Sequence, residues 1–174
     1  MAIGSKYVLR YGSRHIFNPA GLALLGSALL FSTPENWWGA LGDLPWPVIL
    51  MLLAGGWYVA DRSNRIPLVL AFAATYVSIF TLVAFVDPVH VAEMYREPFV
   101  NAAMFFAFFM LTDPPTSPNR YSDQVWFGGV VGLASCLAQL LGAGQAYLLI
   151  GLLAGNASLA FQQRVIRSGL LKGV

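Results

Sequence analysis

Charged residues occur in this chain only in short clusters, and the stretches between the clusters are long and apolar. Only 10% of the residues are charged, whereas about 25% is usual in soluble domains. Hydrophobic residues make up 57%, and the mean hydropathy is +0.65. Helices built from such stretches lack the polar face that a surface helix needs in water. The sequence therefore indicates a polytopic membrane protein. It excludes a disordered chain, a nucleic-acid binder with a basic surface and an ordinary soluble enzyme.

The apolar segments predict an all-α polytopic membrane helical bundle with about six transmembrane spans. The segments are residues 17–32, 45–60, 66–86, 98–112, 124–142 and 145–161. A bilayer core requires about 20 helical residues, and only the third and fifth segments clearly reach that length. We therefore expect some spans to be short or broken helices. Residues 1–174 are interpreted as a single integral membrane domain.

Polar and proline residues mark the boundaries of several spans. Asn64 is expected to cap the third span, with Pro67 in its first turn. Ser122 or Asp123 is expected to cap the fifth span. The run Asp113-Pro114-Pro115 ends the fourth span, because proline cannot continue the hydrogen-bond ladder of a helix.

Lysine and arginine predict the orientation of the chain in the membrane. With six spans, nine of the ten basic residues fall on one side, and Arg96 alone falls on the other. Basic residues favour the cytoplasmic side. The sequence therefore predicts a multi-pass protein of the bacterial inner membrane with both termini in the cytoplasm. Its first partner is then the lipid bilayer, and no nucleic-acid partner is expected.

The chain lacks the residue sets of several kinds of site. Cys136 is the only cysteine, which excludes a cysteine-ligated iron–sulfur cluster within the chain. The two histidines, His15 and His90, fall on opposite sides of the membrane in the predicted topology. No catalytic residues and no metal ligands are predicted. No span has a clear central charge, which weakens the case for autonomous ion transport.

Glycines recur four residues apart in the last two spans. Gly128 and Gly132 lie in the fifth span, and Gly151 and Gly155 lie in the sixth. Small residues on one helix face allow two backbones to approach closely. The pattern predicts that the fifth and sixth spans pack against each other through these glycines.

Two motifs on the predicted cytoplasmic side carry polar groups on a backbone that proline restricts. The first runs from Arg14 to Ala20 and contains Asn18 before a proline. The second runs from Phe109 to Pro118, and its oxygen-bearing side chains are Thr112, Asp113, Thr116 and Ser117. We expect the two motifs to converge in a polar pocket. A flavin edge in that pocket and a simple mutual brace both remain open.

Asn156 is a further candidate, because a buried amide in a span needs hydrogen-bonding partners. A bond between helices and a contact with a ligand are both open for this residue. Its amide could read one edge of a flavin or a quinone.

The motifs resemble the family of NqrB and RnfD, the membrane subunits of the sodium-pumping NADH:quinone reductase and of the Rnf electron-transport complex. The segment from Ser5 to Ala20 is similar to the start of the family's membrane region. The stretch from Phe108 to Pro118 resembles its signature, a helix that ends in a Thr-Asp-Pro-x-Thr-Ser-Pro turn. Asn156 resembles an asparagine near the family's C-terminus. Family members have more spans than this chain, which thus resembles a short or truncated relative.

The resemblance implies a membrane electron-transport subunit that helps carry electrons through a non-covalently bound flavin, FMN or riboflavin. The complex would be an ion-coupled oxidoreductase, and the chain would need its other subunits and would not be catalytic alone. Asn18, Thr112, Asp113, Thr116, Ser117 and Asn156 are the residues expected to bind the cofactor. Covalent FMN is not expected, because the Ser-Gly-Ala-Thr stretch that carries it in better-known members is missing. Its nearest counterpart here is Ala74-Thr75. The alternative is a cofactor-free transporter or an assembly subunit of the same fold.

Overall fold

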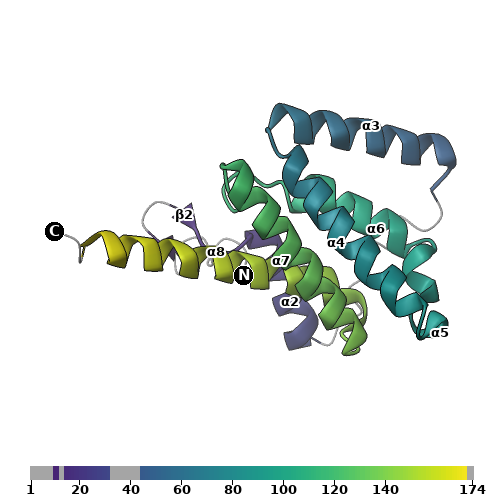
Figure 1. The fold of residues 1–174 in the computed structure, drawn as a ribbon. Helices are drawn as coiled ribbons and strands as arrows, with labels where there is room; N and C mark the ends of the chain where they lie inside the picture. The colour runs from purple at the N-terminus through teal and green to yellow at the C-terminus, as the bar shows by residue number, and fades with distance from the viewer. Residues whose placement is uncertain (1–9, 12–13, 32–43, 172–174) are drawn as a thin grey trace.

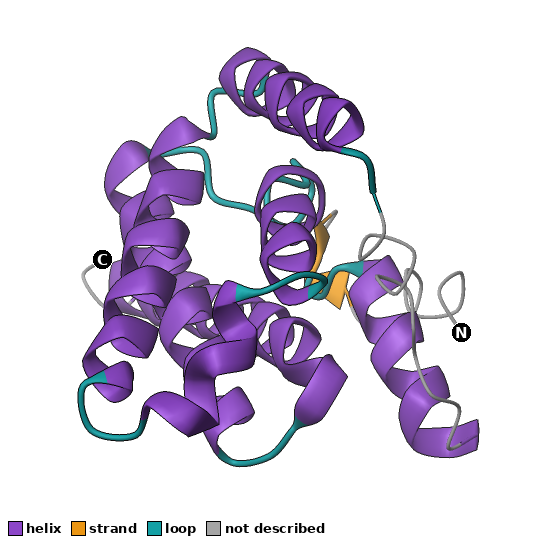
Figure 2. Cartoon of the chain, turned by 90° about the vertical axis from the view of Figure 1, so that its right-hand side faces the viewer, coloured by secondary structure: helices purple, strands orange, loops and turns teal. Residues whose placement is uncertain are grey.

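The computed structural model describes residues 10–11, 14–31 and 44–171, and their fold is a bundle of helices (Figure 1). The longer helices are α2 (Pro19–Phe31), α3 (Trp46–Arg62), α4 (Ile66–Ala84), α7 (Tyr121–Leu140) and α8 (Tyr147–Leu171). Shorter ones are α5 (Pro88–Val91), η2 (Ala92–Tyr95), α6 (Phe99–Phe105), η3 (Phe106–Met110) and η4 (Gly144–Ala146). The strands β1 (Arg10–Tyr11) and β2 (Arg14–His15) form one short antiparallel ladder. Figure 2 shows this ladder beside the helices.

The observed helices confirm the predicted all-α membrane bundle, because each of the six apolar segments contains one of them. The first and fourth segments are short helices, as expected: α2 has 13 residues, and α6 has seven before it continues as the π-helix η3. By length and hydropathy, two helical stretches among the described residues are able to cross a bilayer, Ile66–Ala84 and Gly144–Gln162. The predicted end of the first span, at Ser32, lies outside the described residues.

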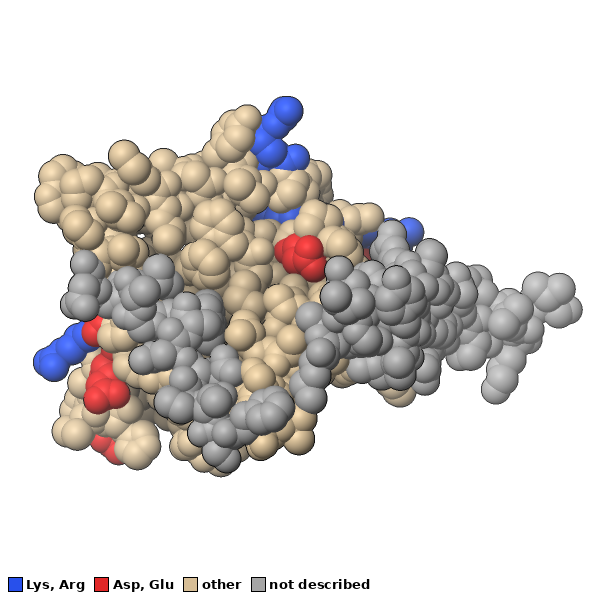
Figure 3. All heavy atoms as spheres, turned by 180° about the vertical axis from the view of Figure 1, so that it is seen from behind, with Lys and Arg blue, Asp and Glu red and all other residues tan. Residues whose placement is uncertain are grey.

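The surface agrees with a bilayer environment. On the face shown in Figure 3, the charged side chains form only a few small, separate groups, and the rest of the described surface is uncharged. Trp46, Trp57 and Trp126 are 72%, 51% and 44% exposed. Large exposed apolar side chains are stable when the surrounding solvent is hydrocarbon, and tryptophan favours the bilayer interface.

Two of the predicted helix caps are wrong. Arg65, and not Asn64, is the residue that precedes α4, and its side chain makes no capping bond. Asn64 instead adopts a left-handed conformation, with φ of 59°, and its side-chain oxygen accepts a hydrogen bond from the Tyr121 hydroxyl. α7 begins at Tyr121, so Ser122 and Asp123 lie inside the helix and not before it. Pro67 does lie in the first turn of α4.

The glycine prediction is half right. Gly151 and Gly155 of α8 do face α7, where a Cβ atom would collide with Ser135 and Val131 respectively. Gly128 and Gly132 of α7, however, face α4. A Cβ at Gly132 would lie 2.9 Å from the Cβ of Thr75, so Gly132→Leu would separate α7 from α4 and not from α8. α7 therefore packs between α4 and α8. The contact with α4 uses the glycines of α7, and the contact with α8 uses the glycines of α8.

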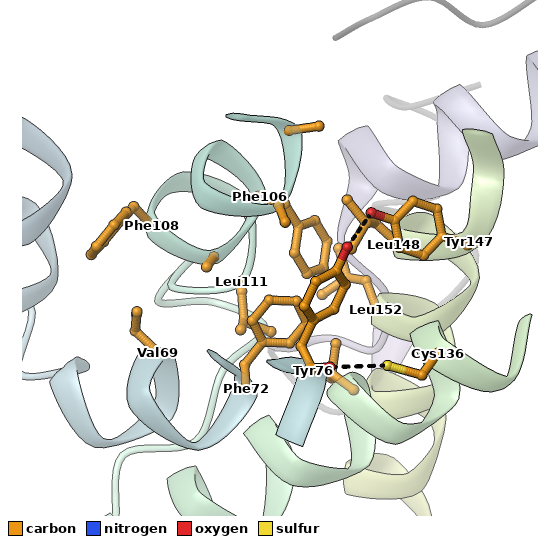
Figure 4. Close-up of a cluster of buried hydrophobic side chains, with 14 of the residues drawn as sticks. Val69, Phe72, Tyr76, Phe106, Phe108, Leu111, Cys136, Tyr147, Leu148 and Leu152 are labelled. Carbon is orange, nitrogen blue, oxygen red and sulfur yellow. Dashed lines mark hydrogen bonds between the residues drawn. The ribbon is translucent and has the colours of Figure 1, made fainter. Parts of the chain in front are cut away.

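Aromatic side chains fill the centre of the bundle (Figure 4). The ring centroids of Phe72 and Phe106 are 5.4 Å apart, and those of Tyr76 and Phe80 are 4.7 Å apart. The hydroxyl oxygens of Tyr76 and Tyr147 lie 3.0 Å apart in a hydrogen bond. This bond satisfies two polar groups that would otherwise be costly to bury.

α3 lies at the edge of the bundle and packs more loosely than the other long helices (Figure 1). Its buried residues are Gly56 and Ala60. A Cβ at Gly56 would lie 2.6 Å from the ring of Phe108, so the glycine is what lets α3 rest on η3.

Replacement of Gly56 should loosen α3. Gly56→Leu places a large side chain against the buried Phe108 ring, and overpacking of this kind costs about 1–3 kcal/mol. We expect faster amide hydrogen exchange throughout α3 and unchanged exchange in α7. Gly55→Leu is the matched control, because nothing lies within 4 Å of a Cβ at that position. Equal exchange rates in the two variants would contradict this account of how α3 docks.

Candidate functional site

The segments that carry the two sequence motifs meet at one end of the bundle, where α2 begins and η3 ends. The polar side chains that join them are those of Asn18, Asp113, Thr116 and Asn156, here called the polar cluster. All but Asp113 are at most 5% exposed, and Asp113 is half-buried. The predicted convergence of the motifs is thus observed, and Asn156 joins them from α8.

Asn18 connects the start of α2 to the second motif. Its side-chain oxygen accepts hydrogen bonds from the backbone N–H groups of Ala20 and Gly21, both at 3.0 Å, which makes it the N-cap of α2. Its amide nitrogen donates to a carboxylate oxygen of Asp113 at 3.3 Å and to the carbonyl of Met110 at 3.5 Å. Both ends of this side chain are therefore in use.

Asn156 is the central member of the polar cluster. Its side-chain oxygen accepts a hydrogen bond from the backbone N–H of Asn18 at 2.9 Å. Its amide nitrogen donates to the backbone carbonyl of Thr116 at 3.3 Å. One buried side chain of α8 thus satisfies backbone groups from two other segments, which is what a buried amide in a membrane helix requires.

Asp113 organises the turn that follows η3. Its backbone carbonyl accepts hydrogen bonds from the N–H groups of Thr116 and Ser117, at 3.1 and 3.0 Å. Its carboxylate accepts one from the Thr116 hydroxyl at 3.0 Å, in addition to the bond from Asn18. The carboxylate therefore stabilises the turn internally and connects it to the start of α2.

Two of the predicted site residues point elsewhere. The Thr112 hydroxyl donates to the carbonyl of Phe108 at 2.5 Å, so it is satisfied within its own helical turn. The Ser117 hydroxyl accepts a hydrogen bond from Nε of Arg65 at 2.9 Å. Ser117 thus belongs to a neighbouring group of residues around Arg65.

The group around Arg65 was missed by the sequence analysis. Arg65 is only 5% exposed, and its guanidinium also donates to the Asn119 side chain at 2.6 Å. Gln124 is completely buried and donates to the backbone carbonyls of Asn64 and Asn119, at 2.9 and 3.2 Å. In the sequence, Arg65 contributes only to the pattern of basic residues that predicts the orientation. The only feature of the sequence that could have indicated the buried role of Gln124 is its position at the start of an apolar span.

The polar cluster is closed on itself. Among the described residues, buried side-chain atoms without a hydrogen-bond partner occur on Gln124, Ser135, Gln139 and Gln162. None of them is a predicted cofactor-binding residue. An anionic flavin phosphate would also face the Asp113 carboxylate. In this arrangement the six predicted residues do not fit a flavin as direct ligands. The four residues of the polar cluster form a brace between α2, the turn after η3 and α8. Thr112 and Ser117 take no part in it.

The described residues contain no group of three or more metal-ligating side chains. They do contain a cavity of about 310 Å³, which lies between α3, α4 and α6. None of the six predicted residues lines it. Thr75, the nearest counterpart of a covalent attachment site, lies inside the α4–α7 contact opposite Gly132.

The comparisons with known proteins agree on one family. The profile of the NQR2, RnfD, RnfE family matches residues 27–168. A curated relative, the RnfD protein of the ion-translocating oxidoreductase complex of Cronobacter sakazakii, is 34% identical over 110 residues. The matched stretch covers 60% of this chain and 30% of the relative, so the match spans less than a third of that protein's length.

Proposed function

Because this chain belongs to the NQR2, RnfD, RnfE family, we propose that it is a membrane subunit of an ion-translocating oxidoreductase complex. The match to the RnfD protein of such a complex and the all-α membrane architecture support this proposal. The observation that carries it is the meeting of Asn18, the turn after η3 and Asn156, because these three segments carry the family resemblance and hydrogen-bond one another. The chain's partners are then the other subunits of the complex.

The finer proposal is that the chain helps carry electrons through a flavin that is bound without a covalent link. Flavin supplies the one- and two-electron chemistry, and a protein contributes position and electrostatics. The polar cluster would act indirectly, because its side chains are already hydrogen-bonded to one another. Its role is to fix the start of α2 and the turn after η3 against the interior of α8.

The absorption spectrum of the purified chain tests the flavin proposal. We expect a yellow protein whose flavin absorbance passes into the supernatant when the protein is precipitated with acid. Absorbance that stays with the precipitate would show a covalent flavin. A colourless protein that still purifies with partner subunits would instead support the alternative, a cofactor-free assembly subunit of the same fold.

We also propose six membrane crossings with both termini in the cytoplasm. Hydrogen bonds join the start of α2, the start of α4, the turn after η3 and the start of α7 at one end of the bundle. Six alternating crossings place all of these on one side, as the distribution of basic residues requires.

Reporter fusions test this topology. A reporter fused after Asp43 should report the periplasm, and one fused after Tyr121 should report the cytoplasm. The physical reason is that each additional crossing reverses the side, while the basic residues keep the loops near Arg65 and Arg120 inside. A fusion after Asn64 serves as the control and should agree with Tyr121. The same compartment for Asp43 and Tyr121 would overturn the six-span arrangement.

A further inference from the structure

An apolar groove lies between α3, α4 and α6. Its volume is about 310 Å³, at the lower end of the ~300–1,000 Å³ typical of ligand sites. Residues that line it include Trp57, Phe72, Tyr76, Tyr95, Met104 and Phe108. Figure 4 shows Val69 and Phe108 on the side that faces away from Tyr147.

The groove offers hydrocarbon and aromatic surface with almost no polar groups. Its two tyrosines present their rings, because both hydroxyls are already in hydrogen bonds. The Tyr76 hydroxyl pairs with Tyr147 at 3.0 Å, and the Tyr95 hydroxyl pairs with Thr81 at 2.9 Å. A ligand with a polar ring edge would lose its hydrogen bonds to water and gain none here. The lining therefore favours a hydrocarbon ligand.

The groove follows α4. Its lining on α4 extends from Val69 to Val77, eight residue steps, which is about 12 Å at 1.5 Å per residue. The floor is closed, since Val69 and Phe72 are 4% and 2% exposed, and the rim is open, since Leu70 and Val77 are each 52% exposed. A lipid acyl chain can thus enter the groove sideways from the surrounding bilayer and stay in a hydrocarbon environment.

We propose that this groove binds one acyl chain of a bilayer phospholipid, which lies along α4 and fills the space beneath α3. The loose packing of α3 supports this assignment, because only Gly56 and Ala60 of that helix are buried. An acyl chain in the groove would give α3 the packing contacts that its own side chains do not make. The proposal concerns lipid binding and is independent of any redox role.

A photoreactive phospholipid tests the proposal on the unmodified chain. The lipid carries a diazirine in the middle of one acyl chain and is reconstituted with the protein in vesicles. Peptide mapping after illumination should place most adducts on the groove segments, residues 69–77 and 100–108. Adducts spread evenly over the outward faces of α4 and α7, including Leu133 and Leu137, would overturn the proposal.

A matched pair of variants provides the second arm. Ala73 lines the groove, whereas its neighbour Ala74 is exposed and does not line it. Ala73→Leu should lower labelling of the groove by at least roughly tenfold, or about 1.4 kcal/mol of binding, and Ala74→Leu should leave it unchanged. Equal labelling in the two variants would refute the assignment. If Ala73→Leu does not fold, as judged by gel filtration, the adduct map of the unmodified chain decides.

Mass spectrometry of the molecules that remain bound after purification identifies the occupant. About one phospholipid per chain is expected, because a groove near the lower volume limit of ligand sites has room for little more. An isoprenoid compound in place of the phospholipid, or a partner helix that protects the groove from labelling, would overturn the choice of occupant.

Discussion

Gly128→Ala is expected to destabilise the bundle, although alanine is a better helix former than glycine. A Cβ at position 128 would lie 2.5 Å from the carbonyl oxygen of Leu68 and 3.0 Å from the backbone nitrogen of Phe72. Both are backbone atoms of α4 and cannot rotate away. The strain of overpacking, about 1–3 kcal/mol and occasionally more, outweighs the gain of up to about 1 kcal/mol in helix propensity.

Gly129→Ala is the matched control for this prediction. The nearest atom to a Cβ at position 129 is the Thr75 hydroxyl oxygen at 3.8 Å, an ordinary contact distance. Thermal unfolding in detergent should show a lower midpoint for Gly128→Ala and an equal or slightly higher midpoint for Gly129→Ala. A midpoint for Gly128→Ala equal to that of the unmodified chain would mean that α4 and α7 are not packed as closely as described. Gly128→Leu should yield no folded protein.

The glycines also show what a sequence pattern determines and what it leaves open. A spacing of four residues identifies a helix face of small residues, because such residues lie on one side of an α-helix. It carries no information about which helix covers that face. The order of the spans suggested α8 as the neighbour of Gly128 and Gly132, whereas α4, more distant in sequence, occupies that side. The contact partner is decided by the packing of the whole bundle.

The helix positions were predictable for a simpler reason. Apolar segments bounded by proline, glycine and charge leave few places for a helix to begin or end. Five of the six predicted spans agree with the observed helices to within three residues at each end, whereas α8 continues to Leu171, beyond the predicted end at residue 161. Gly142 and Gly144, with φ of 84° and 54°, occupy the turn before α8 because few other residues adopt that backbone conformation.

The candidate site could be predicted in part. The two motifs identified Asn18, Asp113 and Thr116, and the predicted topology placed both motifs at one end. Asn156 was identified as an amide inside an apolar span. Their mutual hydrogen bonds could not be predicted, because these depend on distances of a few tenths of an ångström between separate segments. The burial of Arg65 was likewise hidden, since a loop arginine in a sequence looks the same whether it faces water or Ser117.

Asn156→Leu is expected to be among the most destabilising substitutions in the chain. It keeps the size of the side chain but leaves the N–H of Asn18 and the carbonyl of Thr116 without partners, and both bonds are buried. A buried polar group that loses its partner costs about 1–3 kcal/mol, so the loss of the two partners should total about 2–6 kcal/mol. Ser158→Ala, on the same helix, is the control. Its hydroxyl donates a hydrogen bond to the carbonyl of Gly155 within α8. The loss of this bond should leave the free energy of unfolding nearly unchanged.

Thr116→Val then distinguishes a brace from a ligand site. The change is close in shape and removes the bond from the Thr116 hydroxyl to the Asp113 carboxylate, while the backbone bond to Asn156 remains. If the polar cluster is a brace, unfolding midpoint and flavin content should fall together, modestly in Thr116→Val and strongly in Asn156→Leu. If the cluster instead contacts the flavin, Thr116→Val should lose flavin at an unchanged midpoint. The closed set of hydrogen bonds leads us to expect the first result, because a side chain that already has its partners gains little from a ligand.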